Sequence, residues 1–347
     1  DMNHVRGRHQ FRFGGSYTYL RDNRTFGAFQ NPVQQVGTNF GTGMDNFLRG
    51  VVRSFQSAID PQGKFPCNGP VTPQCSVTLP VGQPNFSRSN RYHEWAAYLQ
   101  DSWKVTPRFT LNLGVRYEYF GVQHNKDPFL DSNFYPALGG TEFQQLRDGD
   151  VALAPNSYAK GLWRPDWNNF GPRLGFAWDI FGDGKTSLRG GYSVTYERNF
   201  GNVTFNVIQN PPNYAVISLI AGADVPVIPV SKDLAGPLAG SSGSKGLPRV
   251  SLRAVNPELR TAYAHLWSLS LERQVARNML AALEYSGSAG RNLYSLENPN
   301  RVGAGNVFLG IPCTSSPGDQ GTCLSLIHIS EPTRLLSISY AVFCLKK

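Results

Sequence analysis

Several short patterns contain residue types that could do chemistry, but none of them is complete. Gly184-Lys185-Thr186 matches the end of a phosphate-binding loop, whose pattern requires a glycine where this chain has Asp179. A hairpin turn explains the segment better, because Asp-Gly pairs are typical of tight turns between strands. The six histidines lie on separate segments, and neither His-x-x-x-His nor Gly-x-Ser-x-Gly spacing occurs. We therefore expect no catalytic residue, no metal site, no cofactor and no enzyme activity.

Four of the five cysteines form two closely spaced pairs in sequence rich in Pro, Gly and Thr. The pairs are Cys67 with Cys75 and Cys313 with Cys323. A zinc site would need Cys-x-x-Cys spacing or neighbouring histidines, which neither pair has. Closely spaced loop cysteines favour small disulfides in an oxidising compartment, so we predict two disulfides.

The sequence pattern of a β-strand is clearest in residues 109–119. Every odd position in that stretch is apolar, and every even position is polar or small. Successive side chains of a strand point to opposite faces, so a period of two predicts a strand with one apolar face. A unit of strand, short turn, strand and long polar loop recurs three times along the chain. The predicted strands are 10–20, 95–103, 109–120, 171–180, 186–197, 263–273 and 279–286.

The lengths of strands and loops distinguish between two architectures. A tilted strand needs about ten residues to cross a bilayer, whereas strands of soluble sandwiches are nearer five or six. The predicted loops of about 70, 50 and 60 residues are rare in compact domains but ordinary on the outer side of a barrel. Aromatic residues at strand ends, such as Trp103 and Trp178, suit an interfacial girdle. We predict an all-β fold, a partial antiparallel transmembrane β-barrel of about seven strands with long extracellular loops; a large soluble β-sandwich is the alternative.

Charged side chains on the polar faces of these strands are candidates for the wall of the bore, because those faces look into the lumen of a barrel. They are Arg116, Glu118, Arg173, Arg189, Glu197 and Glu284. They could line a solute path and pack on a plug, or they could simply pair across strands. The facing of 95–103 is ambiguous, because Asp101 interrupts its apolar positions. The net charge of +9 is dispersed, with no run of five or six Lys or Arg, so we expect no nucleic-acid binding.

Neither end of the chain looks like a natural terminus. The first residues have no basic or apolar region of a signal peptide, and a strand begins almost at once, so we interpret the chain as an internal fragment. Residues 324–334 and 338–345 resemble, in order, two parts of a translated sequencing adapter. We therefore assign 1–323 to a partial outer-membrane barrel domain and 324–347 to an adapter-derived tail, without which the net charge is +7.

Residues 98–118 closely resemble the barrel signature of TonB-dependent receptors, in particular the Oar-like, OmpA-related transporters. The matching sequence is YLQDSWKVTPRFTLNLGVRYE. The segments 8–15, 169–179, 188–192 and 267–273 resemble other strands of the same barrel, so the resemblance covers essentially residues 5–300.

This resemblance implies a barrel of about 22 strands whose lumen is closed by a plug. It also implies a TonB box, an N-terminal carboxypeptidase-regulatory-like domain, and uptake of a scarce solute across the outer membrane of a Gram-negative bacterium. The implied partners are outer-membrane lipid, the plug, the TonB complex and the unknown solute. Alternatives are a passive porin, a structural or adhesive barrel, and a soluble secreted β-protein. Loops on rigid scaffolds commonly bind ligands, so the recognition candidates are Tyr135, Tyr158, Trp163, Trp167 and Tyr214.

Overall fold

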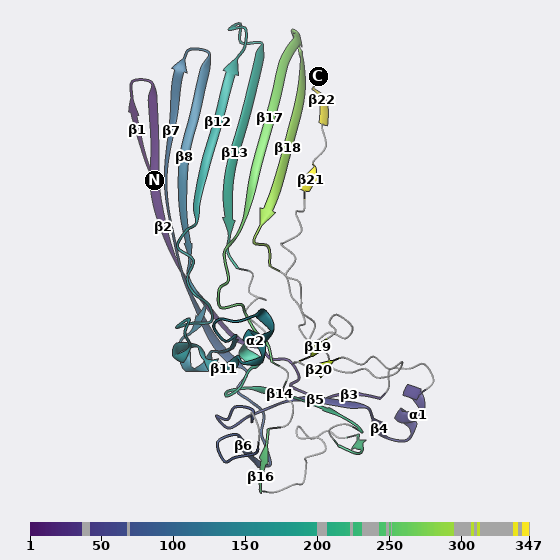
Figure 1. The fold of residues 1–347 in the computed structure, drawn as a ribbon. Coiled ribbons are helices and arrows are strands. Elements are labelled where there is room, and N and C mark those ends of the chain that lie inside the picture. Colours follow the sequence, from purple (N-terminus) through teal and green to yellow (C-terminus); the bar gives the residue numbers. More distant parts are fainter. Residues whose placement is uncertain are drawn as a thin grey trace.

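The computed structural model describes residues 1–36, 42–67, 70–199, 207–222, 225–230, 243–247, 250 and 252–294, together with four short strands between 307 and 346. A long sheet, in the order β1-β2-β7-β8-β12-β13-β17-β18, is its main feature (Figure 1). Each strand pairs antiparallel with its neighbour, which confirms the predicted fold class. The strands are β1 (Met2–Arg6), β2 (His9–Thr25), β7 (Ser87–Thr106), β8 (Phe109–Phe120), β12 (Phe170–Asp179), β13 (Thr186–Glu197), β17 (Ala262–Ala276) and β18 (Met279–Arg291).

Short turns join the strands into hairpins at one end of the sheet (Figure 1). In the turn between β12 and β13, Gly182 and Gly184 have φ of 76° and 70°, values that glycine adopts without strain. The Asp179 carboxylate accepts hydrogen bonds from both glycine amides, at 2.9 and 3.0 Å. The Gly-Lys-Thr segment is thus part of a hairpin turn.

Strands β2 and β7 are longer than the alternation predicts. Their pairing continues from His9 opposite Trp103 to Thr25 opposite Ser87. The predicted strand ended at Leu20, because the residues beyond it are polar on both faces. Residues that are polar on both faces give no alternation of apolar and polar positions, so hydrophobic periodicity does not detect this part of the pairing.

The two faces of the sheet differ sharply, because directly opposed residues of paired strands share a face. Leu99 opposes Val115, and Leu113 opposes Leu174, so the apolar positions of successive strands line up on one face. Leu99, Leu113 and Leu174 remain 52%, 38% and 49% exposed. A soluble sandwich would bury such a face in its core, whereas a membrane barrel turns it toward lipid.

The three long loops fold into substructures at the opposite end of the sheet (Figure 1). The prediction treated them as polar connections and missed their short elements; most of the strands in the first and third loops pair with partners far apart in sequence. The loop after β2 contains β3 (Val33–Gln35), α1 (Thr42–Leu48), β4 (Val51–Val52), β5 (Ser54–Ile59) and β6 (Ser76–Leu79). The loop after β8 contains β9 (His124–Asn125), η1 (Pro128–Leu130), β10 (Ser132–Tyr135), α2 (Glu142–Arg147), β11 (Asp150–Leu153) and η2 (Ala154–Asn156). The loop after β13 contains η3 (Val207–Gln209), β14 (Ala215–Ile220), β15 (Ile228–Pro229) and β16 (Gly243–Gly246).

The first and third loops share three small sheets, in the orders β14-β5-β3, β15-β4 and β16-β6. Their core is a buried apolar cluster of Val52, Phe55, Ile59, Val77, Ala215, Ile217, Leu219, Ile228 and Leu247. We call the described residues of the three loops, between 26 and 86, 121 and 169, and 207 and 261, the loop cap. The clusters of buried apolar residues described in the structure lie in this cap, not between the sheet and a second layer.

The remaining short strands are β19 (Val307–Phe308), β20 (Ile311–Pro312), β21 (Leu336–Ile338) and β22 (Val342–Lys346). β21 and β22 pair with the open edge of β18. Backbone groups of an edge strand pair with any extended segment that reaches them, so this pairing needs no side-chain complementarity. In the described part of the chain, no helix is both long and apolar enough to span a membrane.

Candidate functional site

The six charged candidates for the bore wall share the face opposite the exposed leucines. Arg173 opposes Gly114 on β8 and Ser193 on β13, and Arg189 opposes Ala177 and Ser270. Arg116 opposes Tyr98 and Gly171, Glu118 opposes Ala96, Glu197 opposes Ala262, and Glu284 opposes Ser270. Apart from Tyr98, these directly opposed residues are Gly, Ala or Ser, so the face is polar and has few bulky side chains. It is the face that looks into the bore of a barrel.

Part of this charge is paired within the wall. Arg116 and Glu118 form an ion pair at 2.9 Å within β8, and Arg189 reaches Glu272 of β17 at 3.8 Å. Arg173, Glu197 and Glu284 form no ion pair with any other described residue. The wall therefore combines paired charges with charges that remain open to a partner in the bore.

A shallow hollow lies among β12, β13, β17 and β18, with a volume of about 670 Å³. Arg173 lies at this hollow, and hydroxyl-bearing residues such as Ser193, Thr195 and Ser268 line it. The side chains that line the hollow are short, so a protein segment or a hydrated solute can come close to the backbone of the sheet.

The loop cap is held together by two fully buried asparagines. The Asn133 amide group donates to the carbonyls of Leu162 and Val255, at 2.9 and 2.8 Å, and its oxygen accepts from the Val255 amide at 3.0 Å. The Asn210 side chain donates to the Arg253 carbonyl at 2.6 Å and accepts from the Arg253 amide at 2.9 Å. Both side chains therefore fasten residues 253–255, near the end of the third loop, to other parts of the cap.

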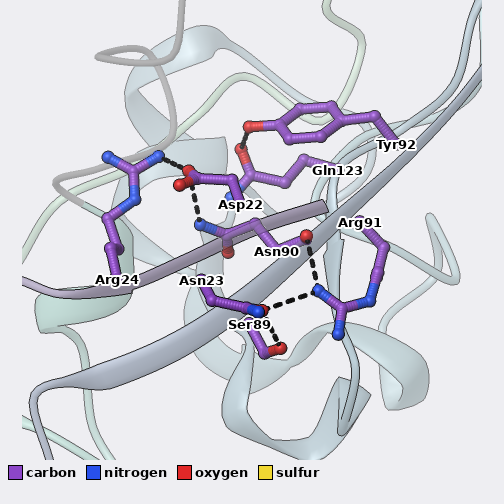
Figure 2. A network of polar contacts seen from close by, with 8 residues as sticks. All are labelled: Asp22, Asn23, Arg24, Ser89, Asn90, Arg91, Tyr92 and Gln123. Carbon is purple, nitrogen blue, oxygen red and sulfur yellow. Dashed lines mark hydrogen bonds and ion pairs between the residues drawn. The ribbon is translucent and has the colours of Figure 1, made fainter. Parts of the chain in front are cut away.

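A polar network ties the loop cap to the ribbon of β2 and β7 (Figure 2). On one side of the ribbon, the Asp22 carboxylate bonds Arg24 and accepts from Asn90 at 3.5 Å. The Tyr92 hydroxyl donates to Gln123 of the second loop at 2.6 Å. On the other side, Asn23 accepts from Ser89 at 2.6 Å and from Arg91 at 3.1 Å. Figure 2 shows these two groups on opposite faces of the ribbon, as strand alternation requires.

Buried charge lies beside this network. Arg88 donates to the carbonyls of Asn85 and Ser87 at 2.7 and 2.8 Å, and burial lowers the pKa of its guanidinium. Asp131 accepts from the Asn125 amide at 2.6 Å, and burial raises the pKa of its carboxyl to about 6. The base of the loop cap therefore contains a carboxyl that titrates close to neutral pH.

Aromatic side chains mark two levels on the apolar face. Toward the loop cap, Tyr117 packs on Trp95 and Phe170 with ring centroids 5.1 and 4.6 Å apart. Toward the hairpin turns, His9 stacks on Trp103 at 5.3 Å and hydrogen-bonds Asp101 at 2.7 Å. Asp101 opposes Phe11 and Leu113, so it belongs to the apolar face, where the His9 ring is the hydrogen-bonding partner of its carboxylate. This resolves the ambiguous facing of 95–103.

A family described as the outer membrane beta barrel domain matches residues 1–329. The chain belongs to this family. This outer-membrane barrel chain is therefore located in the outer membrane of a Gram-negative bacterium, with the loop cap outside the cell and the hairpin turns in the periplasm.

Among solved structures, one similar chain is a mutant of the ferric enterobactin receptor from Pseudomonas aeruginosa. The identity is 10% and the TM-score 0.29, and the match covers 82% of this chain. It covers 27% of the receptor, so this barrel chain spans about a quarter of the receptor's length. A comparison with curated proteins finds no match.

The loop cap of this barrel places the five recognition candidates in different settings. Tyr135, Trp163 and Tyr214 are buried. The Tyr135 hydroxyl donates to the Gly161 carbonyl at 2.8 Å, and burial raises its pKa to about 12. The Tyr214 hydroxyl donates to the Ala28 carbonyl. These three side chains stabilise the cap interior and do not meet a solute in this structure, because neighbouring loops that no local pattern reveals cover them.

The other two aromatic candidates are more accessible. Trp167 is exposed but stacks on Tyr119 at 4.1 Å, which makes it part of the outer aromatic level rather than of the bore mouth. Tyr158 is half-buried beneath Arg164, whose guanidinium lies 5.5 Å from the ring centroid. Tyr158 and Trp167 are therefore the two aromatic candidates that are not buried in the cap.

The cysteine pairs differ in what the structure describes. Cys67 and Cys75 form a disulfide with Cα atoms 5.1 Å apart, within the first loop. Cys313 and Cys323 lie outside the described residues. Across the ranges that the structure covers, no group of three or more His, Cys, Asp or Glu side chains could hold a metal ion.

Proposed function

We propose that this chain forms part of the wall and outer loops of an Oar-like TonB-dependent receptor that takes up a scarce solute. In this proposal its partners are a plug domain, the TonB complex, outer-membrane lipid and an unidentified solute, and it performs no catalysis. The similarity of residues 98–118 to the receptor signature is the starting point.

The openness of the sheet is the observation that supports this proposal most strongly. The eight strands of the long sheet pair in the order in which they occur along the chain. The two outermost of them, β1 and β18, do not pair with each other in the described structure. A barrel closed by eight strands would have joined them, so the complete barrel is wider. A wide barrel with a charged inner wall either conducts ions or is plugged.

The loop cap is evidence for a receptor rather than for an open pore. Three loops with their own apolar core require far more sequence than a passive channel needs at its mouth. Folded loops on a rigid wall are suited to selecting a ligand before it enters the bore. Arg173, Glu197 and Glu284 supply the open charges on which a plug would pack.

Conductance of the full-length protein in a planar bilayer tests the proposal. A plugged receptor shows no steady open current, and deletion of its plug segment produces large, long-lived openings. Steady current from the intact protein would instead identify a passive porin. An intact barrel that stays closed after that deletion would identify a structural or adhesive barrel.

A further inference from the structure

The lipid-facing side of β2, β7 and β9 changes its chemistry in four consecutive rows. The first row is Tyr17 opposite Trp95 and the second is Tyr19 opposite His93. In the third row Arg21 opposes Arg91, which in turn opposes His124 of β9. The fourth row contains Asn23 opposite Ser89. The surface therefore passes from aromatic to cationic to neutral polar as it leaves the bilayer.

Ring contacts confirm that the second and third rows share this side. His93 stacks on Tyr19 at 4.8 Å, and its Nδ1 lies 2.8 Å from the Tyr17 hydroxyl. His124 stacks on His93 with ring centroids 5.8 Å apart and an angle of 5° between the ring planes. Aromatic residues of membrane proteins lie at the level of the lipid headgroups. The cationic row therefore lies at the outer edge of that level.

The charges in the third row have no anion of their own. Arg91 is 6% exposed, and its Nη1 donates to the neutral oxygens of Asn23 and Asn90. Neither Arg21 nor Arg91 forms an ion pair with a described carboxylate. Like charges directly opposite each other in a sheet are destabilising, and a buried charge without a counter-ion is costly. No described carboxylate therefore offsets the two positive charges of this row.

We propose that Arg21, Arg91, His93 and His124 form a binding site for a phosphate group on the headgroup of an outer-leaflet lipid. Arginine suits phosphate because its planar fork donates two parallel hydrogen bonds. Exposed Arg21 contacts the phosphate directly, and the buried charge of Arg91 attracts it from behind. Tyr17, Tyr19 and His93 pack against the sugar or glycerol part of the headgroup. This site does not depend on transport, so the inference stands apart from the receptor proposal.

Native mass spectrometry of the full-length protein in detergent tests this site, with diphosphorylated lipid A as the probe. We expect Arg21→Gln to weaken lipid binding about tenfold, which corresponds to the loss of one charge-assisted contact. The matched control is Arg12→Gln, because Arg12 lies on the same strand but opposes Gln100 on the bore face. The control should bind lipid A as the wild type does.

Two further arms identify the source of the phosphate. Dephosphorylated lipid A should bind wild-type protein as weakly as lipid A binds Arg21→Gln. Millimolar inorganic phosphate should not displace bound lipid A, because the lipid is also held by its acyl chains. Three results would each overturn the proposal. They are equal binding by wild type and Arg21→Gln, an equal loss of binding in Arg12→Gln, and displacement of bound lipid A by inorganic phosphate.

Discussion

At the scale of single residues, Asp131 governs how the loop cap responds to pH. Burial raises the pKa of its carboxyl from 3.8 to about 6, although the Asn125 amide and the Arg88 guanidinium favour the charged form. Because the folded pKa lies above the unfolded one, the stabilisation is complete below pH 3.8 and is lost as the pH rises through about 6.

We therefore predict that the loop cap is more stable in mild acid than at neutral pH. From below pH 3.8 to above about pH 6, the unfolding free energy falls by about 3 kcal/mol in all, and mild acid retains part of this stabilisation. Hydrogen exchange at the Asn125 amide, followed across this pH range, measures it. Asp131→Asn should remove the dependence, whereas Asp183→Asn in a periplasmic turn should leave it intact. A cap that grows steadily more stable toward neutral pH would contradict this prediction.

Asn133 is the residue whose loss should loosen the loop cap most specifically. Replacing it with alanine removes three hydrogen bonds and leaves backbone groups of Leu162 and Val255 buried without partners. We predict that Asn133→Ala lowers the stability of the cap by about 3 kcal/mol. Limited proteolysis in the second and third loops measures the loss. Asn156→Ala, at an exposed position, is the control, and equal cleavage of both variants would refute the assignment.

At the scale of elements, the two faces of a strand should tolerate charge very differently. Leu113 and Asn112 are neighbours on β8 that point to opposite faces. Leu113→Arg places a charge against lipid and should destabilise the barrel by about 2–4 kcal/mol. Asn112→Arg places the same charge in the bore and should change stability by less than about 1 kcal/mol. Denaturant titration of the full-length protein in lipid vesicles measures both, and equal costs would mean that the faces are assigned wrongly.

Alternation was enough to predict the seven long strands, because period-two patterning is a local property. It did not predict the last residue pairs of β2 and β7, where both faces of the two strands are polar. The loop cap was beyond such reasoning for another reason. Phe55 pairs with Leu219 and Ile59 with Ala215, more than a hundred residues away, so no short window contains both partners. The same long-range burial places Tyr135, Trp163 and Tyr214 in the interior of the loop cap.

At the scale of the whole molecule, the structure separates two kinds of apolar surface. The loop cap buries its apolar residues in cores, as a soluble domain does. The sheet leaves Leu99, Leu113 and Leu174 open on one face and carries Arg116, Glu118 and Arg173 on the other. A strand of 12 residues such as β8 extends about 40 Å, which at a tilt of about 40° spans a hydrocarbon core of ~30 Å. Length and facing therefore agree with a bilayer as the solvent of the apolar face.

This assignment of faces is the central claim, and spin-label accessibility along β8 tests it most directly. Single cysteines replace residues 111–116 in the full-length protein, which is labelled and reconstituted in lipid vesicles. We predict that labels at 111, 113 and 115 collide with oxygen dissolved in the bilayer, and that labels at 112, 114 and 116 collide with a water-soluble nickel complex. An accessibility profile without this period of two, or one with the two sets exchanged, would contradict the account.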